Sequence, residues 1–205
     1  MSGSRELSGV VLSREPTGDR FLRIRLFDEN AGLQTVLFPN APKNSKKMSP
    51  PDLFDDLECI LKPRKSESSV PFVSDFQCLK SHREIAIDPQ TFITASEIAR
   101  FYLINGSHLL DPEPRLKLLR SSLSSFARAS TPKVVLLKMY YCFARDEGLP
   151  VRESWLAGLS QSTCGDTLEI LRMPVDQASP DSSKLNDILE NLKIWLNAET
   201  ELRVE

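Results

Sequence analysis

The feature that most constrains the fold of this chain is a change of hydrophobic period near residue 84. From Arg5 to Glu84 the sequence holds five short apolar runs separated by turn-forming residues, and beyond them apolar residues recur at helical spacing. Five short strands in about eighty residues fit a small barrel better than an open parallel sheet, which needs crossover helices between its strands. The chain is therefore expected to be an α+β protein, with the strands first.

The five runs lie in order along the front of the chain. They are "ELSGVVLSRE", "DRFLRIRLFD", "GLQTVLFP", "DLECILKPR" and "VPFVSDFQCLK", and the segments "PTGD", "ENAG" and "KSESS" provide turn signals between them. We interpret residues 1–84 as a five-stranded barrel of the oligonucleotide-binding type, the OB-fold.

The remainder, residues 85–205, is expected to form an all-α helical bundle. Thr94 and Glu97 have capping-box spacing and predict a helix start. A second helix fits "DPEPRLKLLRSSLSSFARA", and a third begins at Thr131-Pro132, is apolar most of the way round and ends at Gly148, a natural left-handed cap. A last helix carries a clean apolar stripe at i, i+3 and i+4 spacing, formed by Leu185, Ile188, Leu189, Leu192, Trp195 and Leu196.

Composition restricts the function classes. The chain has 26 Lys and Arg against 28 Asp and Glu, so it lacks the strongly basic balance of many nucleic-acid binders, and any such contact must be local. Residues 1–84 carry 13 basic against 12 acidic side chains, whereas residues 85–205 carry 13 against 16. No run approaches the ~20 apolar residues of a membrane span, and the first residues lack a signal-peptide core, so a cytoplasmic location is expected.

Enzymatic chemistry finds little support. His82 and His108 are the only histidines, and neither belongs to a metalloprotease, nucleophile-elbow or phosphate-loop motif. The four cysteines form no C-x-x-C pair, so no metal site and no cofactor are expected. The sequence thus favours a protein that is not an enzyme.

One strand stands out as a candidate nucleic-acid surface. Alternation in "RFLRIRLF" directs Leu22, Ile24 and Leu26 to one face. The other face carries Phe21, Arg23, Arg25 and Phe27, a composition typical of platforms on which bases stack while cations meet phosphates. The alternative is that the phenylalanines pack under loops and the arginines are simply solvated.

The segment "LFPNAPKNSKKMSPPD" follows the third expected strand and carries a cluster of lysines between prolines. Long loops on OB barrels commonly line the nucleic-acid groove, where Lys43, Lys46 and Lys47 would neutralise phosphates. Taken alone, such a cluster is more often a solvated loop.

The order of these elements resembles the bacterial RecO family of recombination mediators. The residues that carry the resemblance are "GVVLSREPTGDRFLRIRLFDENAGLQTVLF", the basic segment "PNAPKNSKK", the later "FDDLECILKPRKSESSVPFVSDFQCLKSHREI" and the helical "LLKMYYCFARDEGLPV". Many RecO proteins carry a zinc-binding cysteine cluster after the glycine turn, whereas here "WLAGLSQSTCGDT" keeps only Cys164, so no metal is expected.

The resemblance implies a non-catalytic role in DNA repair. RecO proteins bind single- and double-stranded DNA, anneal strands, associate with RecR and dock the acidic C-terminal tail of single-stranded-DNA-binding protein in the helical domain, which helps load recombinase onto coated strands. For that tail we expect Lys133 and Lys138, which lie on an otherwise apolar helix, to supply the cations. The rival interpretation, favoured by the acidic pI of about 5.8, is a protein-interaction adaptor whose barrel has little nucleic-acid affinity.

Overall fold

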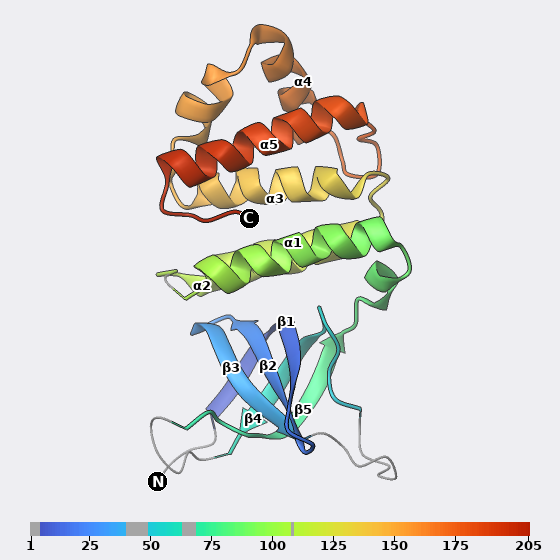
Figure 1. Cartoon of the computed structure of the whole chain (residues 1–205), viewed down its shortest axis with the longest axis vertical. Coiled ribbons are helices and arrows are strands. Elements are labelled where there is room, and N and C mark those ends of the chain that lie inside the picture. Colours follow the sequence, from blue (N-terminus) through green and yellow to red (C-terminus); the bar gives the residue numbers. More distant parts are fainter. Residues whose placement is uncertain (1–4, 40–48, 63–68, 108) are drawn as a thin grey trace. The chain divides into compact units, whose positions relative to one another are not determined.

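The structure is a computed structural model that describes residues 5–39, 49–62, 69–107 and 109–205 (Figure 1). Its contacts divide the chain into two compact units. Unit 1 comprises residues 1–82 and 102–120, and unit 2 comprises residues 83–101 and 121–205. The protein is α+β, with an N-terminal antiparallel sheet followed by helices, as the change of period predicted.

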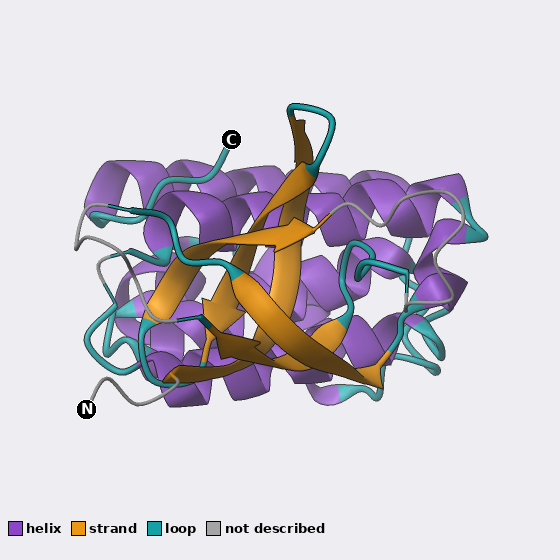
Figure 2. Ribbon diagram, turned by 90° about the horizontal axis from the view of Figure 1, so that it is seen from below, coloured by secondary structure: helices purple, strands orange, loops and turns teal. Residues whose placement is uncertain are grey.

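All five expected strands are present in unit 1. They are β1 (Arg5–Thr17), β2 (Phe21–Asp28), β3 (Gly32–Pro39), β4 (Asp56–Leu61) and β5 (Val73–Lys80). They form one sheet in the order β3-β2-β1-β4-β5, and every neighbouring pair is antiparallel. Figure 2 shows the strands of this sheet in orange. An isolated parallel bridge also joins Leu37 of β3 to Phe72, the residue that precedes β5.

Strand β1 is long because it pairs with two different neighbours. Residues 5–10 pair with β4, residues 9–17 pair with β2, and the register shifts between Val11 and Ser13. Gly9 pairs on both sides, and a Cβ atom added there would lie 2.1 Å from the carbonyl oxygen of Phe27. Only glycine permits this close approach, so the shared strand depends on it.

The inward faces of the strands build the core of unit 1. Leu22, Ile24 and Leu26 of β2 are all buried, which confirms the alternation predicted for this strand. They pack with residues from every other strand, namely Leu7, Val11, Val36, Phe38, Leu57, Cys59, Leu61 and Val73.

Parts of two helices complete unit 1. They belong to α1 (Pro89–Asn105) and α2 (Pro112–Phe126), which also contribute residues to unit 2. Arg120 of α2 donates through Nε and Nη2 to the two carboxylate oxygens of Asp56 on β4, at 2.8 and 2.9 Å. Its Nη2 also donates to Ser8 Oγ of β1 at 3.1 Å. This guanidinium group therefore links α2 to two strands of the sheet.

Unit 2 is built around α3 (Pro132–Asp146) and α5 (Ser182–Glu199), which lie side by side (Figure 1). A 3-10 turn η1 (Arg83–Ala86), a π-helical turn η2 (Val151–Leu156) and α4 (Gln161–Arg172) complete its elements. The ring of Phe101 packs edge-on against Tyr140 and Phe143 of α3, with centroid distances of 5.2 and 4.8 Å. All six residues of the predicted apolar stripe on α5 are buried.

The predicted boundaries of α3 are confirmed, whereas the start of α1 is corrected. Thr131 occupies the N-cap position of α3, and Pro132 is the first residue of the helix. Gly148, after the end of the helix, adopts a left-handed φ of 74°. Helix α1 begins at Pro89 rather than at the expected capping box, and the hydroxyl of Thr94 donates to the carbonyl of Gln90 inside the helix. No helix of the described segments has both the length and the apolar character that crossing a bilayer requires.

The Arg120–Asp56 pair generates the first prediction. Changing Arg120 to Gln should lower the free energy of unfolding by about 2–3 kcal/mol, because the Asp56 carboxylate, whose side chain is 11% exposed, would lose its charge partner. The effect should be measured by chemical denaturation monitored by circular dichroism. Tryptophan fluorescence is unsuitable for unit 1, because both tryptophans, Trp155 and Trp195, belong to unit 2.

Arg14 provides a matched control, because its ion pair with Asp52 at 3.1 Å is largely solvent-exposed. Changing Arg14 to Gln should lower the free energy of unfolding by less than about 1 kcal/mol. Equal losses in the two variants would contradict a special role for the Arg120 contact.

Candidate functional site

The outward face of β2 presents one exposed cation beside a half-buried ring. Arg23 is exposed, and its register partners are Glu15 on β1 and Leu37 on β3. Phe21, two residues earlier on the same face, packs edge-on against Phe72 with a centroid distance of 5.1 Å and an interplanar angle of 67°. Arg23 and Phe21 thus lie on one face at this end of the strand, and their role in binding nucleic acid stays a prediction.

At the other end of β2 the expected platform does not form. Phe27 is 0% exposed, and its ring packs against Tyr102 of α1 at a centroid distance of 5.0 Å. A ring without exposed surface cannot stack on a base, so the expectation for Phe27 is wrong. Arg25 is half-buried, and its Nη2 donates to the carbonyl oxygen of Leu103 at 3.3 Å, which draws the guanidinium group toward the helix.

The expected lysine cluster of Lys43, Lys46 and Lys47 lies outside the described residues. Pro39, the last residue of β3 and the last described residue before that cluster, pairs with Phe21 of β2. Phe72 was not anticipated from the sequence, since "VPFVSDF" gives no sign that one of its rings is exposed.

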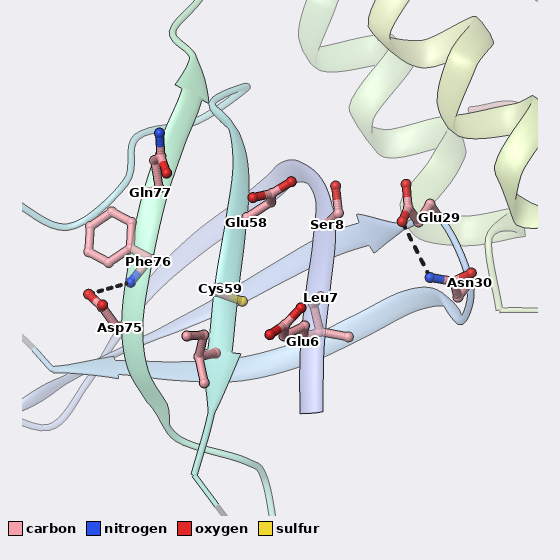
Figure 3. Close-up of a pocket in the computed structure, with 11 residues that line it drawn as sticks. Glu6, Leu7, Ser8, Glu29, Asn30, Glu58, Cys59, Asp75, Phe76 and Gln77 are labelled. Atoms are coloured by element: carbon pink, nitrogen blue, oxygen red, sulfur yellow. Dashed lines mark hydrogen bonds between the residues drawn. The ribbon is translucent and has the colours of Figure 1, made fainter. Parts of the chain in front are cut away.

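A second surface of unit 1 is acidic. A cavity of about 390 Å³ lies over β1, β4 and β5 and the turn after β2 (Figure 3). Its carboxylates come from Glu6, Glu29, Glu58 and Asp75. Burial, together with the nearby Asp28 charge, raises the pKa of the Cys59 thiol in its wall to about 12. This surface disfavours phosphate and keeps that thiol protonated at neutral pH.

Unit 2 contains a pocket of opposite charge. A cavity of about 440 Å³ lies between α3, η2 and α4. Its cationic side chains are Lys138, Arg145, Arg152 and Arg172, and its apolar walls come from Tyr141, Leu156, Leu168 and Leu171. We call it the cationic pocket. Cations around an apolar floor are the chemistry that binds an acidic segment with apolar side chains.

The two lysines expected to bind a partner are separated in the structure. Lys138 lines the cationic pocket, where its Nζ donates to the carbonyl oxygens of Leu171, at 3.1 Å, and Met173 at the end of α4. Burial lowers the pKa of Lys138. Lys133 lies outside this pocket and donates to Asn186 Oδ1 at 2.7 Å.

The three arginines of the cationic pocket were not anticipated from the sequence. Arg152 Nε donates to the hydroxyl oxygen of Tyr141 at 3.0 Å, and Arg145 Nε pairs with Asp146 at 2.7 Å. They come from different elements, η2 and α3, so no local motif announces them. In the portion of the chain that the structure describes, no three His, Cys, Asp or Glu side chains are grouped to hold a metal ion.

The different environments of the two rings on β2 generate the second prediction. Changing Phe27 to Ala should lower the free energy of unfolding by about 3–4 kcal/mol, because it opens a cavity beneath Tyr102. Changing Phe21 to Ala should lower the free energy of unfolding by less than about half of that amount, because the Phe21 ring is only half-buried. Chemical denaturation checks both values, and an unchanged stability in the Phe27 variant would contradict its core position.

Comparisons with known proteins name no family for this chain. The sequence matches no protein-family model, and no curated protein is significantly similar to it. The RecO resemblance consequently depends on the quoted sequence segments, and function is inferred from the β2 surface and the two cavities.

Proposed function

We propose that the protein is a non-catalytic recombination mediator of the RecO type. In this role it binds and anneals single-stranded DNA, also contacts duplex DNA, and helps load recombinase onto strands coated by single-stranded-DNA-binding protein. RecR and the acidic tail of that coating protein are its proposed partners. The cytoplasm, where bacterial DNA lies, is the location that this role requires.

The strand pairing of unit 1 supports an OB-type barrel. In such barrels the first strand is shared between two halves of the sheet, as β1 is shared by β2 and β4. The first and last strands in the sheet order, β3 and β5, approach each other where Leu37 N donates to the carbonyl oxygen of Pro71 at 2.9 Å. We propose that this contact closes the barrel, with the nucleic acid lying across β2 and β3.

The observation that carries the proposal is the exposed Arg23 beside Phe21, at the end of β2 where Phe21 pairs with Pro39 of β3. A cation for phosphate and a ring for bases within one strand are the two elements of a single-strand platform. Lys43, Lys46 and Lys47 add three charges to the segment that begins one residue beyond Pro39.

The cationic pocket of unit 2 supports the proposed tail partner. A peptide that ends in apolar residues and carries several carboxylates would place its side chains on Leu168 and Leu171 and its charges near Arg145 and Arg172. Lys138 contributes less to this contact than the sequence suggested, because it already holds the carbonyl end of α4.

A second candidate function is a protein-interaction adaptor with little nucleic-acid affinity. The acidic cavity over β1, β4 and β5 favours it, because four carboxylates on one part of the sheet repel phosphate. Salt dependence separates the two functions, since only a nucleic-acid binder releases counterions on binding.

The third prediction concerns the lysine segment. In a titration of fluorescent single-stranded DNA, log affinity should fall linearly with log salt concentration, with a slope of roughly −0.7 per neutralised phosphate. Changing Lys43, Lys46 and Lys47 together to Ala should weaken binding at low salt and flatten this slope by up to about 2.

The control removes the same charge elsewhere. Changing Lys117, Lys133 and Lys184 to Ala alters net charge equally, but these lysines lie on helices and are engaged with Glu113, Asn186 and Asp166. The slope should then stay close to that of the wild type. Absence of binding by the wild-type protein at low salt would favour the adaptor.

The fourth prediction concerns the cationic pocket. A peptide with several carboxylates and an apolar C-terminus should bind the full chain with an affinity on the order of micromolar by calorimetry. Changing Arg145 and Arg172 to Glu should abolish this binding, because the pocket would then repel the peptide. Changing Lys133 to Glu should leave it unchanged, since Lys133 lies outside the pocket. Equal losses in both variants would point to general charge attraction rather than to this pocket.

A further inference from the structure

Phe72 is a large aromatic residue that its neighbours cover only in part. Its side chain is 38% exposed, and its ring meets Phe21 edge-on at a centroid distance of 5.1 Å. The 67° inclination is an edge-to-face arrangement, in which the two rings do not stack on each other, and Phe21 is itself half-buried. We call Phe21 and Phe72 the ring pair.

The backbone that carries the ring pair is well anchored. The carbonyl oxygen of Phe72 accepts a hydrogen bond from Lys62 N at 2.8 Å, and Phe72 bridges Leu37 of β3. Phe21 pairs with Thr17 and Pro39 at the end of β2. The rings therefore stand on strands held by main-chain hydrogen bonds, which lowers the entropy lost when a ligand stacks on them.

Charge complementarity indicates which ligand suits this surface. Arg23 lies on the same outward face as Phe21, opposite the exposed Glu15 of β1. Arg20 is exposed beside Asp19 in the turn that precedes β2. The carboxylates of the acidic cavity belong instead to β1, β4, β5 and the turn after β2. A polyanion with flat apolar groups, which describes a single-stranded nucleic acid, fits the ring pair and is disfavoured over the acidic cavity.

We propose that the ring pair selects single-stranded over duplex DNA, and that Phe72 is a base-stacking residue. This inference rests on the proposed function and adds the origin of strand preference. In a duplex the bases are already stacked on one another, so their flat faces are not accessible to a protein ring. Arginine and lysine contacts bind both forms, whereas the faces of Phe21 and Phe72 accept unpaired bases only.

The test compares two ligands against a set of Phe72 variants. A fluorescent oligothymidylate and a blunt duplex of equal length are titrated at one low salt concentration with the full chain. Changing Phe72 to Ala should weaken single-strand binding roughly tenfold while duplex binding changes less than about twofold. Changing Arg23 to Gln should lower the affinity for both ligands by a similar factor.

Conservative variants separate stacking from folding. Changing Phe72 to Leu retains an apolar side chain but removes the ring, so selectivity should be lost, whereas changing it to Tyr should preserve selectivity. Changing Phe92 to Ala removes a ring that is 40% exposed in unit 2, and both affinities should stay unchanged. Circular dichroism confirms that each variant is folded, and the Leu and Tyr variants decide the outcome if the Ala variant unfolds.

Two outcomes overturn the proposal, and they are distinguishable. If the wild-type chain binds the oligothymidylate and the Leu variant keeps its preference for the single strand, the ring pair does not select it, and the mediator role stands. If the wild-type chain binds neither ligand, both the mediator role and the ring-pair assignment are wrong.

Discussion

Unit 1 depends on one long strand, β1, whose first and second halves pair with different partners. Because β1 carries β4 on its first half and β2 on its second, it must bend, and the register shift between Val11 and Ser13 allows this bend. Gly9 lies where both pairings overlap, and no side chain fits against the carbonyl of Phe27 there. Pairing with β1 places β2 and β4, and β3 and β5 pair in turn with β2 and β4.

The shared strand also separates two kinds of surface. β2 presents Arg23 and Phe21, which packs against Phe72 just before β5, whereas β4 and β5 themselves contribute carboxylates to the acidic cavity. A chain with a net charge of −2 can thus still offer a local cationic and aromatic surface. Such a separation of charge would direct a polyanion away from the acidic cavity, as the proposed function requires.

Unit 2 obtains its cationic pocket by a different route. Arg145, Arg152 and Arg172 come from three elements, and the carbonyl end of α4 is held by Lys138. Lys138, which is half-buried, therefore positions the wall of the pocket, while Arg145 and Arg152, which also line it, contact Asp146 and Tyr141. The proposed DNA surface and the proposed tail pocket belong to separate units, so each can be altered without touching the other.

Local sequence determined much of this protein. Alternation located all five strands and the buried face of β2, and Pro132, Gly148 and the stripe from Leu185 to Leu196 located α3 and α5, because period, caps and turns act over a few residues. Tertiary structure alone decided the rest. Alternation placed Phe21 and Phe27 on one face of β2. In the structure, however, Phe27 is buried against Tyr102, whereas Phe21 packs against Phe72. The sequence alone does not show which distant residues meet. The assignment of residues 102–120 to the unit of the sheet, and the convergence of three arginines, likewise depend on long-range contacts, which no local pattern encodes.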